Sequence, residues 1–375
     1  MHRSQITVLG MDRVELAALV EGLGEPPYRG RQLGDAVYRQ RIDSFEKIST
    51  LPRTLRKKLL EQGVSVGLPR IDNRFVSMDG TVRYLIAFDD TQSVETVWMP
   101  EGDGAESDEA AEALTPFEPG ARGWHRATIC VSSQVGCAVD CQFCLTALLG
   151  VKRNLTAGEI AGQVLTVLED QKVSPQHDRI NLVFMGMGEP FLNYDNFMKA
   201  VRLLVQEVGL AESRMTVSTA GIVPRIAEFG RETIRPRLAI SLNASNDDLR
   251  SRLMPLNKKW NLEMLMAAAR DFPLRGRERV TFEYVLLQGV NDSEQNAYEV
   301  VELLRGINAR VNLIALNPGP GIAFETPSDQ RVEIFQGILR NAGILTFVRR
   351  PRGRDISAAC GQLKRTVEIA TTPER

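Results

Sequence analysis

The sequence is poor in several features that mark common protein classes. Its 375 residues include only 5 cysteines and 3 histidines. It has no apolar run of about 18 residues, and acidic residues interrupt the apolar N-terminal stretch, so neither a transmembrane helix nor a signal peptide is expected. We therefore expect a cytoplasmic protein that does not contact membranes. Thiols stay mostly reduced in that compartment, so clustered cysteines indicate metal or redox chemistry.

The sequence also lacks a large excess of charge of either sign. Its net charge is −1, with 43% hydrophobic and 25% charged residues. This ordinary globular composition allows one domain of about 200–250 residues and a smaller unit. The charge is uneven, because residues 101–126 contain seven acidic residues against Arg122 and Arg126. That segment carries −5, so the rest of the chain carries +4, which is compatible with RNA binding.

The pattern along the chain predicts four segments. Residues 1–65 read as short helices with a basic surface, for which RNA contact and an ordinary solvated face are equally good interpretations. Residues 66–100 alternate like strands and contain a hairpin signal, "DG". Residues 101–126 have little apolar periodicity and predict an acidic insertion loop. Residues 127–375 are expected to form the core domain.

In the core segment, β-rich apolar runs alternate with helical patterns. Helices are expected at about 156–171, 193–208, 224–232, 246–253, 261–272, 293–306 and 328–342. This alternation favours parallel strands with crossover helices, hence an α/β fold with a full or partial barrel. Chemistry in such a fold lies at the C-terminal ends of the strands, and the distinctive residues of this sequence follow the predicted strands.

Four of the five cysteines lie in the stretch "CVSSQVGCAVDCQFC", from Cys130 to Cys144. Cys137, Cys141 and Cys144 have C-x3-C-x2-C spacing, which can hold three irons of a [4Fe–4S] cluster and leave the fourth iron open. Zinc prefers four ligands, usually in two pairs, and no second C-x2-C pair is present. A closed four-cysteine cluster would need Cys130 or Cys360 as its fourth ligand. Taken alone, each of these two cysteines reads more simply as a small buried residue.

The cysteine loop, with Phe143 before its last cysteine, resembles the motif of the radical S-adenosylmethionine superfamily. "GMGEP" at 186–190 is similar to that superfamily's Gly-Glu-Pro motif. The resemblance is closer still to the RNA adenine-C2 methyltransferases (the RlmN family). It spans roughly residues 15–370, with matching stretches "CVSSQVGC", "VKRNLTAGEI", "FMGMGEPFLNYDN", "VSTAGIVPRI", "AISLNASNDDLR", "MPLNKKW", "RVTFEYVLLQGVND" and "DISAACGQL". It implies a partial (β/α)6 TIM-like barrel of the radical S-adenosylmethionine type.

The resemblance implies a function and a mechanism. The substrates would be an adenine of the peptidyl-transferase centre in 23S rRNA and the adenine 3′ of the tRNA anticodon. Each turnover would use one [4Fe–4S] cluster and two molecules of S-adenosylmethionine. Cys360 would be methylated, hydrogen abstraction would make that methyl a radical, and the radical would add to adenine C2 to give a covalent RNA adduct. Glu95 would accept the C2 proton, and Cys130 would resolve the adduct through a Cys130–Cys360 disulfide.

The resemblance also assigns cofactor contacts, which follow from the matching motifs. Besides the iron ligands Cys137, Cys141 and Cys144, the residues expected at S-adenosylmethionine are Gly188, Glu189, Ser218, Ser241, Leu242, Asn243 and Asn317. The sequence departs from the family in two places. Asn243 stands where the family usually has histidine, so this contact cannot carry charge. The 101–126 insertion is longer and more acidic than the usual link.

Two other functions remain open from the sequence. A C8-adenine rRNA methyltransferase of the antibiotic-resistance type shares the cysteines, although "ETVWMP" is closer to the C2 group. An RNA-binding or iron–sulfur module without methyl transfer would leave Cys130, Cys360 and Glu95 unexplained. The expected partners are the two RNAs, an electron donor such as flavodoxin or ferredoxin, and a thiol reductant system. We expect a monomer.

Overall fold

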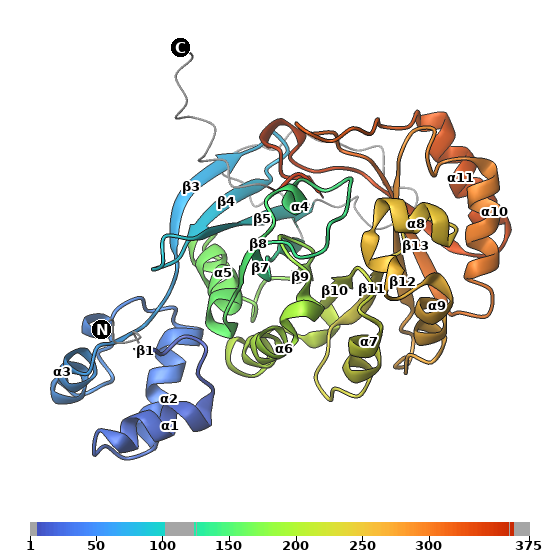
Figure 1. Ribbon diagram of the computed structural model, residues 1–375. Helices are drawn as coiled ribbons and strands as arrows, with labels where there is room; N and C mark the ends of the chain where they lie inside the picture. Colours follow the sequence, from blue (N-terminus) through green and yellow to red (C-terminus); the bar gives the residue numbers. More distant parts are fainter. Residues whose placement is uncertain (1–5, 102–123, 125, 360, 364–375) are drawn as a thin grey trace, which may run out of the picture.

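The computed structural model describes residues 6–101, 124, 126–359 and 361–363. Its centre is a ten-stranded sheet with the order β14-β13-β12-β11-β10-β9-β6-β5-β4-β3 (Figure 1). The strands are β3 (Arg70–Val76), β4 (Val82–Ala87), β5 (Ser93–Glu101), β6 (Arg126–Cys130), β9 (Ile180–Phe184), β10 (Met215–Thr219), β11 (Arg237–Ser241), β12 (Val280–Leu286), β13 (Ala309–Ala315) and β14 (Leu345–Arg349). From β6 to β14 all neighbours are parallel, which confirms the predicted α/β partial barrel.

Helices cover the outer face of this curved sheet (Figure 1). They are α5 (Ala157–Asp170), α6 (Tyr194–Leu203), α7 (Val223–Gly230), α8 (Asp247–Leu253), α9 (Leu262–Arg270), α10 (Glu294–Leu303) and α11 (Asp329–Asn341). Each lies within a range predicted from apolar periodicity, except that α7 begins one residue earlier than predicted. Alternate strand residues such as Phe184, Val217 and Phe282 are fully or almost fully buried in the core. Their strand neighbours therefore face the inside of the barrel.

Residues 66–100, which alternate in the sequence, extend the same sheet. β3, β4 and β5 pair antiparallel with one another, and β5 pairs antiparallel with β6. Their junction with the core brings Val97 opposite Cys130. This segment is therefore continuous with the wall of the barrel, and the alternation of β5 decides which of its residues face inward.

The N-terminal residues form a small helical unit beside the barrel, shown in blue in Figure 1. It contains α1 (Arg13–Gly22), α2 (Tyr28–Gly34) and α3 (Arg53–Glu61), and a short parallel pair, β1 (Ile6–Thr7) with β2 (Val64–Ser65). Arg13 Nε lies 2.9 Å from the almost buried carboxylate of Glu207, and Lys199 Nζ lies 2.7 Å from Glu15. These pairs fix the unit against α6 and the segment that follows it. Within the described residues no helix is long and apolar enough to cross a membrane.

Candidate active site

One cavity opens at the C-terminal ends of the parallel strands. Nine of the ten residues predicted to bind iron or cofactor line it: Cys137, Cys141, Cys144, Gly188, Glu189, Ser218, Ser241, Asn243 and Asn317. The tenth, Leu242, is fully buried and is not part of the lining. Its carbonyl oxygen instead accepts a hydrogen bond from the buried guanidinium of Arg250, at 3.1 Å. Residues from five chain segments therefore meet because parallel strands end at the same edge.

The cysteine loop is held at its base by a two-stranded ribbon. β7 (Gln134–Gly136) pairs antiparallel with β8 (Val151–Asn154), and the Cys137 amide donates to the Gly150 carbonyl at 3.1 Å. Gly136 has φ +82°, and a Cβ there would lie 1.8 Å from the Gly150 oxygen. Only glycine allows this approach. The short helix α4 (Leu145–Leu148) begins directly after Cys144 and closes the loop.

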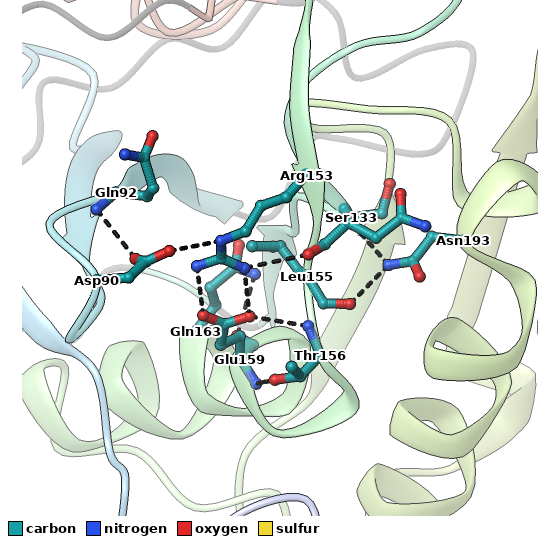
Figure 2. A network of polar contacts seen from close by, with 10 residues as sticks. Asp90, Gln92, Ser133, Arg153, Leu155, Thr156, Glu159, Gln163 and Asn193 are labelled. Atoms are coloured by element: carbon teal, nitrogen blue, oxygen red, sulfur yellow. Dashed lines mark hydrogen bonds and ion pairs between the residues drawn. The ribbon is translucent and has the colours of Figure 1, made fainter. Parts of the chain in front are cut away.

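A polar network fixes the ribbon to the barrel (Figure 2). Arg153 of β8 lies between two carboxylates, with Nε 2.6 Å from Asp90 and Nη2 2.7 Å from Glu159. Nearby, the Asn193 amide donates to the carbonyl oxygens of Ser133 and Leu155, at 2.9 and 2.7 Å. The loop that carries the cysteines is therefore tied to α5, to the β4–β5 turn and to the start of α6.

The three cysteines of the loop are partly buried, and they pack against a second apolar cluster that includes Phe143. Burial raises the pKa of the Cys137 thiol to about 12 and that of Cys141 well above its ordinary value. Iron binding therefore has to displace protons from these thiols. Among the described residues, no group of three or more histidine, cysteine or acidic side chains could hold a single metal ion. Three separate thiols around one cavity fit a cluster.

Glu189 of the GMGEP turn is buried and firmly held. Its carboxylate accepts hydrogen bonds from the backbone amides of Ala220 (2.6 Å) and Phe191 (3.0 Å). Its own amide donates to Gln134 Oε1 at 2.9 Å. Burial nevertheless raises the pKa of Glu189 to about 7. Gly188, with φ +100°, lets the turn pass so close that a Cβ would lie 2.6 Å from the Gln134 side chain.

Asn317 offers a free acceptor to a ligand in the cavity. Its Oδ1 is buried and has no hydrogen-bond partner among the described residues. A buried oxygen of this kind is costly unless something donates to it. Asn243 differs, because its side chain already has partners: Oδ1 accepts from the Val285 amide at 2.8 Å, and Nδ2 lies 3.3 Å from Met254 Sδ. Asn243 also has φ +57°, a conformation that asparagine tolerates better than most residues.

Glu95 and Cys130 lie on the inner face of neighbouring strands. Cys130 pairs with Val97, and Glu95 is two residues before Val97 on β5, so their side chains leave the same face. Cys130 is 8% exposed and Glu95 is fully buried. Glu95 Oε1 accepts a hydrogen bond from Arg83 Nη1 on β4 at 2.6 Å. The two predicted catalytic residues therefore share one sheet face with a buried cation.

Sequence reasoning missed the residues that connect these groups. The Ser132 hydroxyl donates to the Glu95 carbonyl at 2.6 Å and accepts from the Met187 amide at 2.9 Å. Buried Gln163 of α5 accepts from the Thr96 hydroxyl and the Ser132 amide, at 2.8 and 2.9 Å. The strand of Glu95, the loop after Cys130 and the GMGEP turn are thus joined by two side chains. The polar stretch "SSQ" between Cys130 and Cys137, which contains Ser132, was the sequence feature that could have indicated this connection.

Cys360 lies outside the described residues, and so does most of the predicted acidic insertion. The neighbours of Cys360 are well anchored. The Gly361 carbonyl accepts from the Leu145 amide at 2.8 Å, and Gly361 lines the cavity. Upstream, Asp355 accepts from the Ser77 hydroxyl at 2.6 Å, and the Gly353 amide donates to Asp79 at 3.0 Å. The chain is fixed on both sides of this cysteine, to the cysteine loop on one side and to the β3–β4 turn on the other.

Two family models match the chain. The Radical SAM superfamily model matches residues 131–301, which contain the cysteine loop, the GMGEP turn and the strands up to β12. The model of the ribosomal RNA large subunit methyltransferase N-terminal domain matches residues 6–64, the helical unit. The two matches follow one another along the chain and leave β3–β6 between them.

Curated relatives and a solved structure resemble the whole chain. The "probable dual-specificity RNA methyltransferase RlmN" of Koribacter versatilis is 65% identical over 352 residues, covering 94% of this chain and 99% of the relative. The dual-specificity RNA methyltransferase RlmN of Syntrophobacter fumaroxidans is 45% identical, covering 93% and 95%. The crystal structure of a radical SAM methyltransferase from Sphaerobacter thermophilus aligns with a TM-score of 0.84 at 42% identity, covering 96% and 99%.

Proposed function

Because the chain belongs to the RlmN family of dual-specificity RNA methyltransferases, we propose that it methylates carbon 2 of adenine in 23S rRNA and in tRNA. The family places it among radical S-adenosylmethionine enzymes, which use a [4Fe–4S] cluster and S-adenosylmethionine. The observation that carries the proposal is that the predicted cofactor and catalytic residues gather on the inner side of the barrel. The cysteine loop, the GMGEP turn and the strand-end polar residues line one cavity, and Glu95 and Cys130 lie on the adjoining strands.

The residues present fit the cofactors. Cys137, Cys141 and Cys144 would hold the cluster, which supplies the electron that cleaves S-adenosylmethionine to a 5′-deoxyadenosyl radical. The unpartnered Asn317 Oδ1 and the buried Glu189 carboxylate offer acceptors to the donors of the second cofactor. Gly188, Ser218 and Ser241 line the same cavity and would complete its contacts. Leu242 would support the cavity through its backbone, and Asn243 through its hydrogen bond to β12.

The chain's own residues would carry the methyl group and the protons. The Cys360 thiolate takes a methyl group from one S-adenosylmethionine, and that methyl loses a hydrogen atom to the radical made from a second. The sulfur-bound carbon then bonds to C2 of adenine. Glu95 accepts the C2 proton, and the Cys130 thiolate attacks the Cys360 sulfur. The carbon–sulfur bond would break as the Cys130–Cys360 disulfide forms. The released carbon would take up a proton to become the methyl group, and the unpaired electron of the adduct would leave to an acceptor such as the oxidised cluster. Cellular thiols would then reduce the disulfide.

Arg83 gives Glu95 a defined orientation for this role. A buried carboxylate is stable only when it is paired and hydrogen-bonded, and the guanidinium 2.6 Å away provides both. The Ser132 hydroxyl fixes the backbone of the same residue. A proton acceptor held in this way has little freedom to move, so the adenine has to come to it. The target base therefore has to leave its stack before the reaction.

The remaining expectations belong to the same proposal. RNA substrates follow from the family. The chemistry needs an electron donor, such as flavodoxin or ferredoxin, and a thiol reductant. The monomeric state and the cytoplasmic location remain expectations from the sequence. The C8-methylating type of enzyme is the second candidate, because it would use the same cysteines. In a module without methyl transfer, Glu95, Cys130 and Cys360 would have no catalytic role.

Two cysteine variants test the proposal. Cys360→Ala should abolish methylation and leave the cluster's absorbance and iron content unchanged. Cys130→Ala should accumulate RNA covalently attached to the protein, detected as a shifted band on a denaturing gel that ribonuclease removes. Cys137→Ala is the control that loses the cluster. Loss of activity in Cys130→Ala with no RNA adduct would contradict the resolving role of this cysteine.

A further inference from the structure

The cavity contains one carboxylate that the mechanism does not use. Glu283 lies on β12 and lines the cavity together with Ser218 of β10 and Ser241 of β11. The three residues come from neighbouring strands and all face inward. Ser218 Oγ lies 3.0 Å from Glu283 Oε2 and 3.2 Å from Ser241 Oγ. The three side chains form a continuous hydrogen-bonded chain across the sheet.

The carboxylate decides the direction of these hydrogen bonds. An ionised carboxylate only accepts, and a serine hydroxyl has a single hydrogen to give. Ser218 therefore donates its hydrogen to Glu283. The contact between the serines then requires Ser241 to donate to Ser218. Both hydroxyl hydrogens are then committed to protein partners, so each serine oxygen can only accept a hydrogen bond from a ligand in the cavity.

Several groups around Glu283 offset part of the effect of its burial. Burial raises the pKa of this carboxyl, but the hydrogen bond from Ser218, the charge of Arg349, a hydrogen bond from Asn312 and the charge of Arg310 all act in the opposite direction. Arg310 of β13 and Arg349 of β14 thus lie near enough for their charges to act on this carboxylate.

We propose that Glu283 is a positioning residue that makes Ser218 and Ser241 accept hydrogen bonds from the two ribose hydroxyls of S-adenosylmethionine. Two acceptors 3.2 Å apart suit two adjacent hydroxyl groups, which are donors on neighbouring carbons. This inference rests on the proposed function, since it takes S-adenosylmethionine to be the ligand of the cavity.

The test measures binding rather than turnover. Calorimetric titration of the cluster-reconstituted protein would compare S-adenosylmethionine with its 2′-deoxy and 3′-deoxy analogues. The wild-type protein should bind each analogue on the order of tenfold more weakly, because one hydrogen bond near a charge is lost. Glu283→Ala should bind the parent cofactor about as weakly as the wild type binds the analogues, and should no longer discriminate among the three.

Two further variants keep the test interpretable. Glu283→Gln has the same shape and should fold even where alanine does not, and its neutral amide should reduce the discrimination. Glu263→Gln removes an exposed carboxylate from α9 and should bind like the wild type. Unchanged discrimination in both Glu283 variants would overturn the inference, and a loss of RNA affinity alone would assign the serines to an RNA ribose instead. A wild-type protein that does not bind S-adenosylmethionine would contradict the proposed function itself.

Discussion

Arg83 and Glu95 form an ion pair inside the sheet, with Arg83 Nη1 2.6 Å from Glu95 Oε1 and the side chains 4% and 1% exposed. The pair joins two adjacent antiparallel strands, and Arg83 also stacks over Phe75 of β3 at 4.3 Å. A buried charge without its partner costs several kcal/mol, so this pair links the proposed proton acceptor to the stability of the barrel edge.

Replacing Arg83 should therefore damage both folding and catalysis. Arg83→Met leaves the Glu95 carboxylate buried without its cation and should lower the free energy of unfolding by about 3–5 kcal/mol. Arg83→Lys retains the charge but not the planar guanidinium, and should lose less stability while still slowing methylation. Urea denaturation followed by circular dichroism measures the first effect. If Arg83→Met were as stable as the wild type, the ion pair would not support the sheet.

Glu189 should make the stability of the cluster-free protein depend on pH. Its pKa is raised from 4.5 to about 7 by burial, so the folded state holds this proton more tightly than the unfolded state. The stabilisation is complete below about pH 4.5 and is lost as the pH rises through about 7. Glu189→Gln should flatten the unfolding free energy over this window. An identical pH profile in the wild type and the variant would contradict the assignment.

Gly136 should be intolerant of any side chain. Gly136→Ala places a Cβ 1.8 Å from the Gly150 carbonyl at a positive φ, so the ribbon below the cysteine loop has to shift. We expect loss of iron binding after reconstitution, measured by iron content and visible absorbance. Gly337→Ala is the matched control, because no atom lies within 4 Å of its Cβ position in the middle of α11. It should bind iron normally and gain up to about 1 kcal/mol.

Asp355 should matter for turnover more than for cofactor binding. Its carboxylate accepts from the Ser77 hydroxyl and the Met78 amide, which fixes the segment before Cys360 to the β3–β4 turn. Asp355→Ala removes both bonds and should lower kcat roughly tenfold or more through misplacement of the cysteine. S-adenosylmethionine affinity should stay unchanged, as measured by calorimetry. An unchanged kcat would show that this anchor is dispensable.

Much of the fold could be predicted from the sequence, because parallel strands and outer helices have strong local signals. The apolar runs ending at Phe184 and Thr219 and the periodic helices between them indicated the barrel. The same logic placed Ser218, Ser241 and Asn317 at one edge, since residues after parallel strands meet there. The cysteine loop and the GMGEP turn were recognisable as motifs, and their convergence on one cavity followed from topology.

The contacts between distant segments could not be predicted. Arg83 reads as an ordinary charged position in an alternating strand, and only the register of β4 with β5 brings it to Glu95. Gln163 is one polar residue in an apolar helix, yet it joins Thr96 to Ser132. Asn243, expected at the cofactor, uses its amide to hold β12. Such pairings depend on three-dimensional register, which periodicity does not encode.

The position of the methyl group on adenine is the central claim, and nucleoside analysis tests it most directly. The protein would be reconstituted anaerobically with iron and sulfide, then supplied with reductant, S-adenosylmethionine and unmodified 23S rRNA or tRNA. The RNA would be digested and its nucleosides separated by mass spectrometry against standards. We predict 2-methyladenosine from both RNAs. 8-Methyladenosine, or 5′-deoxyadenosine formed without any methylated adenosine, would contradict the account.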